Sequence, residues 1–284
     1  MANYTISASL LWYNRSRISQ KKQNCYVGSR IEMFNEVIAA RTMNSLYIWL
    51  DIVFLLVLLG ILLVTKRYQA AVVGAIGGVI YFIVDYGIFF RLLGTRAVEG
   101  ADPFWFLLWL SISYGFTNFV WIWLWLDRDG HALEWSLLIV TGWFCTALLS
   151  QNFGGAATIA IMRGTMDYHG VMALLMFVGY TLLCIHNIRC RPEEKVPLKW
   201  ILAIGVLVQF GWEFVLAVTG IRNLSLNTII TNSLLETNMG LPYLYLIHRS
   251  VNKRFGENLK PVKERIWGHE SGIYIRKSAE NIIK

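Results

Sequence analysis

Charged residues are scarce in this sequence. Asp, Glu, Lys and Arg make up 15% of the 284 residues, whereas an ordinary soluble domain has about 25%. Hydrophobic residues make up 56%, and many of them gather in long runs. This composition excludes an ordinary soluble enzyme and indicates a multi-pass protein of the cell membrane. The formal charge of +8 lies mostly in loops and tails, where it favours membrane lipids over nucleic acid as partners.

Metal and cofactor motifs are also lacking. The four cysteines, Cys25, Cys145, Cys184 and Cys190, form no CxxC or Cys/His pattern, so we interpret them as packing residues. We therefore expect neither a metal nor a cofactor. The five prolines form no linker that would divide the chain into separate domains.

Seven apolar segments approach the roughly 20 residues that a helix needs to cross the hydrocarbon core of a bilayer. The sequence therefore predicts an all-α bundle of seven transmembrane helices over residues 43–249, between a polar basic tail at 1–42 and a basic tail at 250–284. The seventh segment is the most polar, and its Gly240-Leu241-Pro242 sequence favours a break in the helix. The predicted spans are residues 46–65, 70–93, 104–126, 133–153, 170–188, 198–220 and 226–247.

The distribution of Lys and Arg over the short loops predicts the orientation, because cytoplasmic loops carry more of them. With the N-terminus outside and the C-terminus in the cytoplasm, the outer loops hold only Arg96, Arg163 and Arg222, with Arg91 at a helix end. The basic N-terminal tail opposes this orientation. If the seventh segment does not span, the alternative is six helices with that tail inside.

Four carboxyl groups stand inside the predicted spans, namely Asp51, Asp85, Glu213 and Glu236. A charge at mid-bilayer costs at least about 2.5–3.5 kcal/mol. No Lys or Arg lies deep in a predicted span, so we expect these acids to be paired with donors, protonated or facing water. In this orientation they lie in the outer half or near the middle, which predicts a shared cavity. Asp51 lies near the interface and is expected to be structural.

Helical spacing places further polar and aromatic side chains on the same faces as these acids. Asp85, for example, shares a face with Tyr81 and with the Gly74-xxx-Gly78 pair, which lets a neighbouring helix approach closely. We predict Asp85, Glu236 and Glu213 as catalytic residues. The predicted substrate-binding residues are Tyr81, Tyr114, Asn118, Gln209, Trp212, Asn232 and Tyr243.

Two stretches place an acid among aromatic residues: residues 80–86 read Ile-Tyr-Phe-Ile-Val-Asp-Tyr, and 236–245 read Glu-Thr-Asn-Met-Gly-Leu-Pro-Tyr-Leu-Tyr. With these stretches, the chain from Met43 onward resembles the small seven-helix membrane terpene cyclases of the fungal meroterpenoid type. The resemblance implies that Asp85 and Glu236 match the two catalytic acids. The acid types are exchanged, and the family's Trp-Glu pair of the second helix occurs here in the sixth predicted span, as Trp212-Glu213.

Two functions are compatible with these features. One is an intramembrane acid-catalysed cyclase or isomerase for a lipophilic, isoprenoid-like small molecule. A buried neutral carboxylic acid can protonate an alkene or epoxide, and aromatic faces stabilise cations. The alternative is a proton-coupled small-molecule transporter that uses its carboxylates as proton relays. A retinal-based sensor is disfavoured because the last predicted span has no lysine. The oligomeric state stays open.

Reporter fusions test the predicted topology. Fusions after Arg96 and Arg163 should report the outside, because these residues lie in the less basic loops. Fusions after Arg222 and Arg249 should report opposite sides, and the same signal from both would show that the seventh segment does not span. Cytoplasmic signals are expected after Lys66, Arg128, Arg191 and Arg249.

Overall fold

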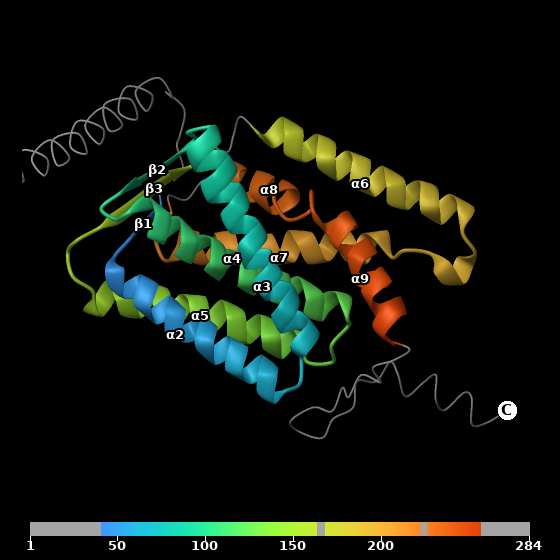
Figure 1. The fold of residues 1–284 in the computed structure, drawn as a ribbon, viewed down its shortest axis with the longest axis horizontal. Helices are drawn as coiled ribbons and strands as arrows, with labels where there is room; N and C mark the ends of the chain where they lie inside the picture. The colour runs from blue at the N-terminus through green and yellow to red at the C-terminus, as the bar shows by residue number, and fades with distance from the viewer. Residues whose placement is uncertain (1–40, 164–167, 223–225, 257–284) are drawn as a thin grey trace, which may run out of the picture.

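The protein is mostly helical (Figure 1), and its computed structural model describes residues 41–163, 168–222 and 226–256. Within these residues, six helices are long and apolar enough to cross a membrane, in agreement with the expected all-α class. The predicted tails lie mostly outside the described residues. The helices are α2 (Ser45–Val64), α3 (Tyr68–Phe82), η1 (Ile83–Leu92), α4 (Pro103–Leu126), α5 (Ala132–Phe153), α6 (His169–Arg189), η3 (Pro192–Glu194), α7 (Leu198–Val218), α8 (Leu226–Leu235) and α9 (Leu241–Gly256).

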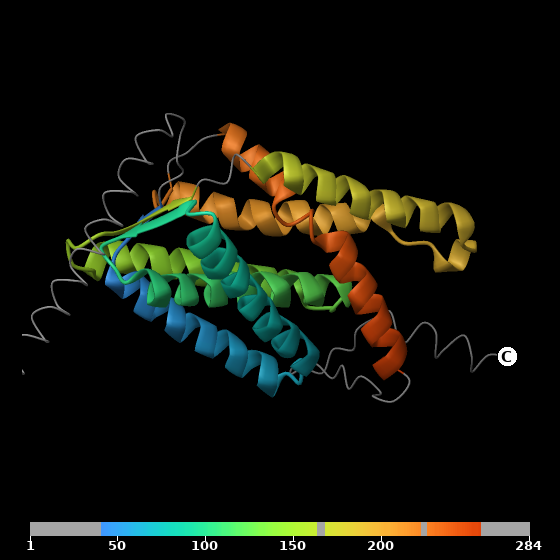
Figure 2. The same ribbon diagram turned by 45° about the horizontal axis from the view of Figure 1, so that its top comes forward.

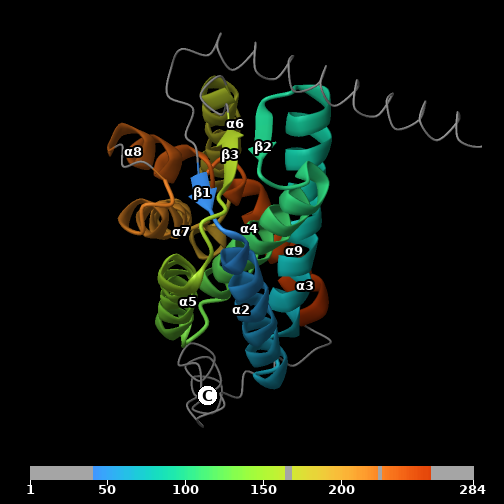
Figure 3. The ribbon, with the colours of Figure 1, turned by 90° about the vertical axis from the view of Figure 1, so that its left-hand side faces the viewer.

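A small antiparallel sheet, absent from the prediction, lies at one end of the bundle. Its strands are β1 (Arg41–Met43), β2 (Arg96–Glu99) and β3 (Ile159–Arg163), in the order β1-β3-β2. Figure 3 looks onto this end, with the strands in front of the helices. The register places Arg96 directly opposite Arg163. Two segments that were expected as outer loops are thus folded against the bundle.

Helix α4 runs through the middle of the bundle. Asp102 caps its first turn by accepting hydrogen bonds from the backbone N–H groups of Phe104 and Trp105, and Pro103 stands at the first helical position, where its missing N–H costs nothing. In the most apolar stretch of α4, 83% of the residues are buried, whereas only 17% are buried in the corresponding stretch of α6. The apolar residues of α6 therefore mostly face outward, as expected for a helix in contact with lipid.

The seventh predicted span consists of two helices with a break between them. Helix α8 ends at Leu235, residues 236–240 form turns, and α9 begins at Leu241 (Figure 2). The chain nevertheless passes from one end of the bundle to the other. Arg222, just before α8, bridges to β1 at the sheet end, whereas His248 in α9 lies 2.8 Å from Asp127 at the C-terminal end of α4.

Glycines bring α3 and α4 into close contact, as the Gly74-xxx-Gly78 pair predicts. Gly77 and Gly78 are buried against α4. At Gly115 of α4, an added Cβ would lie 2.7 Å from both the Gly77 carbonyl oxygen and the Gly78 Cα. Both atoms belong to the backbone, so no side-chain rotation can relieve the clash. The two helices therefore depend on a glycine at this position.

Substitution of Gly115 by Ala should destabilise the protein by about 1–3 kcal/mol, because the methyl group forces the two backbones apart. Gly60→Ala in α2 is the matched control, since no atom lies within 4 Å of its added Cβ. The measurement is the midpoint of thermal unfolding in detergent. An equal midpoint for both variants would contradict close packing of α3 on α4.

Candidate functional site

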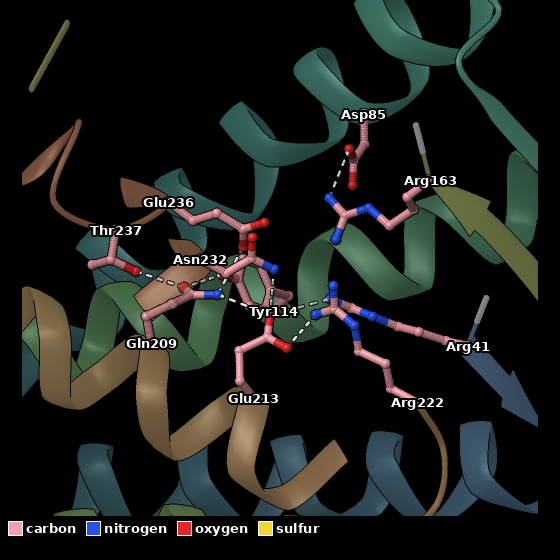
Figure 4. Close-up of polar contacts among 10 residues, drawn as sticks. All are labelled: Arg41, Asp85, Tyr114, Arg163, Gln209, Glu213, Arg222, Asn232, Glu236 and Thr237. Atoms are coloured by element: carbon pink, nitrogen blue, oxygen red, sulfur yellow. Dashed lines mark hydrogen bonds and ion pairs between the residues drawn. The ribbon is translucent and has the colours of Figure 1, made fainter. Parts of the chain in front are cut away.

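Four arginines reach the acids of the apolar helices from the sheet end of the bundle. Arg41, Arg96 and Arg163 belong to β1, β2 and β3, and Arg222 follows α7. The sequence contains no cation deep in a predicted span, and we expected acids without cationic partners. That expectation is wrong for Asp85, which Arg163 of β3 contacts, and for Glu213, which Arg222 contacts (Figure 4).

Asp85 is held by two arginines. Its Oδ1 atom accepts hydrogen bonds from Arg96 Nη2 at 3.1 Å and Nε at 3.3 Å, and from Arg163 Nη2 at 3.4 Å. Its side chain is only 6% exposed. Burial lowers the pKa of Arg96 to about 10, and the positive charge of Arg163 acts in the same direction. Arg96 is therefore still charged at neutral pH. We interpret Asp85 as an ionised counter-charge and not as a proton donor.

Glu213 is fully buried in α7 and is also paired. Its Oε2 atom accepts a hydrogen bond from Arg222, and Arg41 Nη2 lies 3.9 Å from Oε1. Asn232 Nδ2 donates to Oε1 at 3.2 Å. Burial lowers the pKa of Arg41 to about 10, with Arg163 and Arg222 adding to the effect, so Arg41 stays charged at neutral pH.

Glu236 has a different environment. It lies in the break between α8 and α9, and its Oε2 atom accepts a hydrogen bond from Gln209 Nε2 at 2.7 Å. Within the described residues, no Arg or Lys forms an ion pair with it. Of the three predicted catalytic acids, it is the one with a neutral hydrogen-bond donor in place of a cation.

Gln209 joins two of the acids, Glu213 and Glu236, into one network. Its Oε1 atom accepts hydrogen bonds from the hydroxyl groups of Tyr114 and Thr237, both at 2.7 Å. Its Nε2 group donates to Glu236 and, at 3.4 Å, to Glu213. These four contacts fix the orientation of the amide, because both acceptor contacts fall on the oxygen and both donor contacts on the nitrogen. The N–H side of Gln209 is thereby held toward Glu236.

A cavity of about 290 Å³ adjoins this network. Its walls come from α3, η1, α4, α6, α9, β2, β3 and the α8–α9 break, and they are largely apolar. Asn118 lines it at 1% exposure, and neither atom of its amide has a hydrogen-bond partner within the described residues. A buried amide of this kind requires a ligand or a water as its partner.

The predicted site residues separate into three groups. Asp85, Glu236, Tyr81, Tyr114 and Asn118 line the cavity. Behind them lie three members of the hydrogen-bond network, namely Gln209, Glu213 and Asn232. The ring of Trp212 also lies there, tilted against the Tyr114 ring at a centroid distance of 5.1 Å.

Tyr243 lies outside this site. Its hydroxyl donates to the backbone oxygen of Leu175 in α6 at 2.9 Å. The break turns α9 relative to α8, so the continuous helical spacing that placed Tyr243 beside Glu236 does not apply.

The four arginines were missed because they stand outside the apolar runs. A strand signal was nevertheless present. Residues 159–163, Ile-Ala-Ile-Met-Arg, form a short apolar run with two β-branched residues, shortly after Gly154-Gly155, and such a run is compatible with a buried strand. Asp51, expected to be structural, accepts a hydrogen bond from Trp109 Nε1 at 2.9 Å and so ties α2 to α4.

Comparison of the chain with protein-family models, curated proteins and solved structures found no match. Within the described residues, no three His, Cys, Asp or Glu side chains group to hold a metal ion. The absence of a cofactor stays a prediction. The chemistry of the site is therefore inferred from its own side chains.

The ion pairs at Asp85 make a prediction about stability. Asp85→Asn should destabilise the protein by about 3–5 kcal/mol, because it leaves two buried arginines without a counter-charge. Asp102→Asn is the matched control: Asp102 is exposed, and asparagine caps a helix as well as aspartate does. Thermal unfolding of both variants in detergent gives the comparison. Equal stability would mean that Asp85 does not balance the arginines.

Proposed function

We propose that the chain is an intramembrane cyclase or isomerase in which Glu236 donates a proton to a lipophilic, isoprenoid-like substrate. The observation that carries this proposal is the contrast among the three acids. Asp85 and Glu213 contact arginines, whereas Glu236 lines the apolar cavity with the Gln209 amide as its hydrogen-bond donor. A carboxyl group in such a setting is suited to carry a proton.

The proposed reaction starts with transfer of the Glu236 proton to an alkene or epoxide of the substrate. The resulting cation reacts with a second double bond or rearranges, and a proton lost from carbon returns to the Glu236 carboxylate. Protons and electrons balance, and the product is an isomer of the substrate. The Gln209 N–H group stabilises the carboxylate that forms between these two steps.

The cavity walls fit a cationic intermediate. The rings of Tyr81 and Tyr114 lie 5.0 Å apart, and Phe119 lies 6.0 Å from Tyr81. All three rings line the cavity. Aromatic faces attract positive charge, and an apolar enclosure keeps out water that would quench a cation. In this scheme Asp85 balances the charge of the arginines and does not donate a proton. Of the two catalytic acids that the resemblance to the terpene cyclases implies, the proposal therefore keeps only Glu236.

The proposal includes a membrane placement. We place the N-terminus outside and the C-terminus in the cytoplasm, with α8 and α9 together as a seventh, broken span. The sheet then lies at the outer end of the bundle. Broken backbone within a membrane is tolerated where it lines a cavity, and the 236–240 break does so through residues such as Glu236 and Gly240.

The same break favours the transporter as second candidate. Secondary transporters place their substrate sites at interrupted helices near the middle of the membrane. Here the interruption carries Glu236 itself, which would take up and release the coupled proton. In that case the substrate leaves the cavity chemically unchanged.

Glu236→Gln tests both candidates. Glutamine keeps the shape of the side chain and still accepts from Gln209, but it has no acidic proton. Turnover of isoprenoid alkenes, epoxides, alcohols and phosphates, followed by mass spectrometry in membranes, should fall by about 10²–10⁴-fold. Glu99→Gln removes an exposed carboxyl group and is the matched control.

The outcomes separate the two functions. No product from any of these substrates with the wild-type protein would count against the enzyme. Proton-driven uptake into proteoliposomes, lost in Glu236→Gln, would then establish the transporter. An enzyme that is fully active as Glu236→Gln would show that another group donates the proton.

A further inference from the structure

We infer that the substrate is an amphiphile whose anionic head group, a phosphate or carboxylate, binds Arg163 and Arg96 at the sheet end of the cavity. The inference deepens the proposed function and rests on it for the lipophilic part of the ligand. The head-group site itself is argued from the charges and contacts of the sheet.

The sheet concentrates more positive charge than Asp85 can balance. Arg96 and Arg163 are direct cross-strand partners, and like charges in this position repel each other. Both guanidinium groups line the cavity and contact the same Asp85 oxygen, Oδ1. Two cations thus share one carboxylate, and an excess of one positive charge remains beside the cavity when Glu236, which also lines it, carries its proton.

Arg163 has N–H groups that are available to bind a ligand. Its hydrogen bond to Asp85 is long, at 3.4 Å, and its buried Nε has no partner within the described residues. Figure 4 shows the guanidinium reaching from β3 toward Asp85. A guanidinium group matches the two oxygens of a phosphate or carboxylate with two parallel N–H groups. Arg163 is therefore the side chain that an anionic head group would contact first.

The whole cluster of arginines and acids also carries a net positive charge. Four arginines face three carboxylates, those of Asp85, Glu213 and Glu236. The cluster is positive by one charge when all three acids are ionised. It is positive by two when Glu236 carries the proton that the proposed reaction requires. An anion at Arg163 reduces this excess in a site with little water to screen it.

The opposite end of the cavity is apolar. Ile122, Leu241 and Leu244 line it there, and α4 rises roughly 12 Å from Tyr114 to Ile122. Such a space suits a hydrocarbon chain extending away from the head group. The unpartnered amide of Asn118 lies between the two ends and offers a hydrogen bond to one further polar atom on that chain. Charge at one end and apolar walls at the other select an amphiphile.

Binding of two probes with the same chain, farnesyl phosphate and farnesol, tests the inference. The purified full-length protein in detergent should bind farnesyl phosphate about tenfold or more tightly than farnesol, as expected for a charge-assisted contact. Arg163→Gln should remove this preference, so that the two probes bind with similar affinity. Arg67→Gln is the matched control: Arg67 also pairs with an aspartate, Asp129, and is 13% exposed against 12% for Arg163, but it does not line the cavity.

Three results would overturn the inference. The first is equal affinity for the two probes, and the second is an unchanged preference in Arg163→Gln. The third is displacement of bound farnesyl phosphate by inorganic phosphate at an equal concentration. The last would indicate a site for free oxyanions. If Arg163→Gln does not fold, Arg163→Lys keeps the charge but loses the paired donors. Its preference should fall, and an unchanged preference would exclude the guanidinium contact.

The binding assay needs no turnover, so the two proposals can fail separately. A wild-type protein that prefers farnesyl phosphate but yields no product from any isoprenoid keeps the head-group site and refutes acid catalysis. A protein that converts isoprenoids but binds farnesyl phosphate no more tightly than farnesol keeps the proposed catalysis and refutes the head-group site.

Discussion

The ion pairs between the arginines of the sheet and the acids of the bundle hold the sheet end of this protein together. Strands of three to five residues are too short to be stable alone, and the cross-strand pair of Arg96 and Arg163 weakens them further. Asp85 and Glu213 supply the missing counter-charges. In turn, the arginines offset the cost of burying these two carboxylates in their ionised form. Sheet and bundle therefore stabilise each other.

This mutual dependence also separates the roles of the acids. Asp85 and Glu213 form ion pairs with arginines, whereas Glu236 accepts a hydrogen bond from the amide of Gln209. Gln209 is itself fixed by the hydroxyl groups of Tyr114 and Thr237. One carboxyl group beside the cavity is thus left without an arginine partner among the described residues, as the proposed proton transfer requires. The excess of arginines leaves room for a negative charge that the protein does not supply.

The break in the seventh segment limits what helical spacing can predict about which side chains share a face. Asn232 precedes the break, and it contacts Glu213 within the network. Tyr243 follows the break, and it points to α6 instead. Spacing within one helix predicts a shared face only while the helix is continuous. The Gly240-Leu241-Pro242 sequence indicated the interruption, but not the direction in which the chain continues.

The sequence by itself determined the class of the protein and the position of six membrane-competent helices, because hydrophobicity is summed over neighbouring residues. It also pointed to the acids, since a carboxyl group inside an apolar run is visible locally. Only the tertiary structure decided which acids are neutralised. Asp85 and Arg163 are 78 positions apart, and their contact depends on the pairing of β2 with β3, which local composition does not determine. Charge balance at the site is a property of the folded chain, because it is fixed by distances through space and not along the sequence.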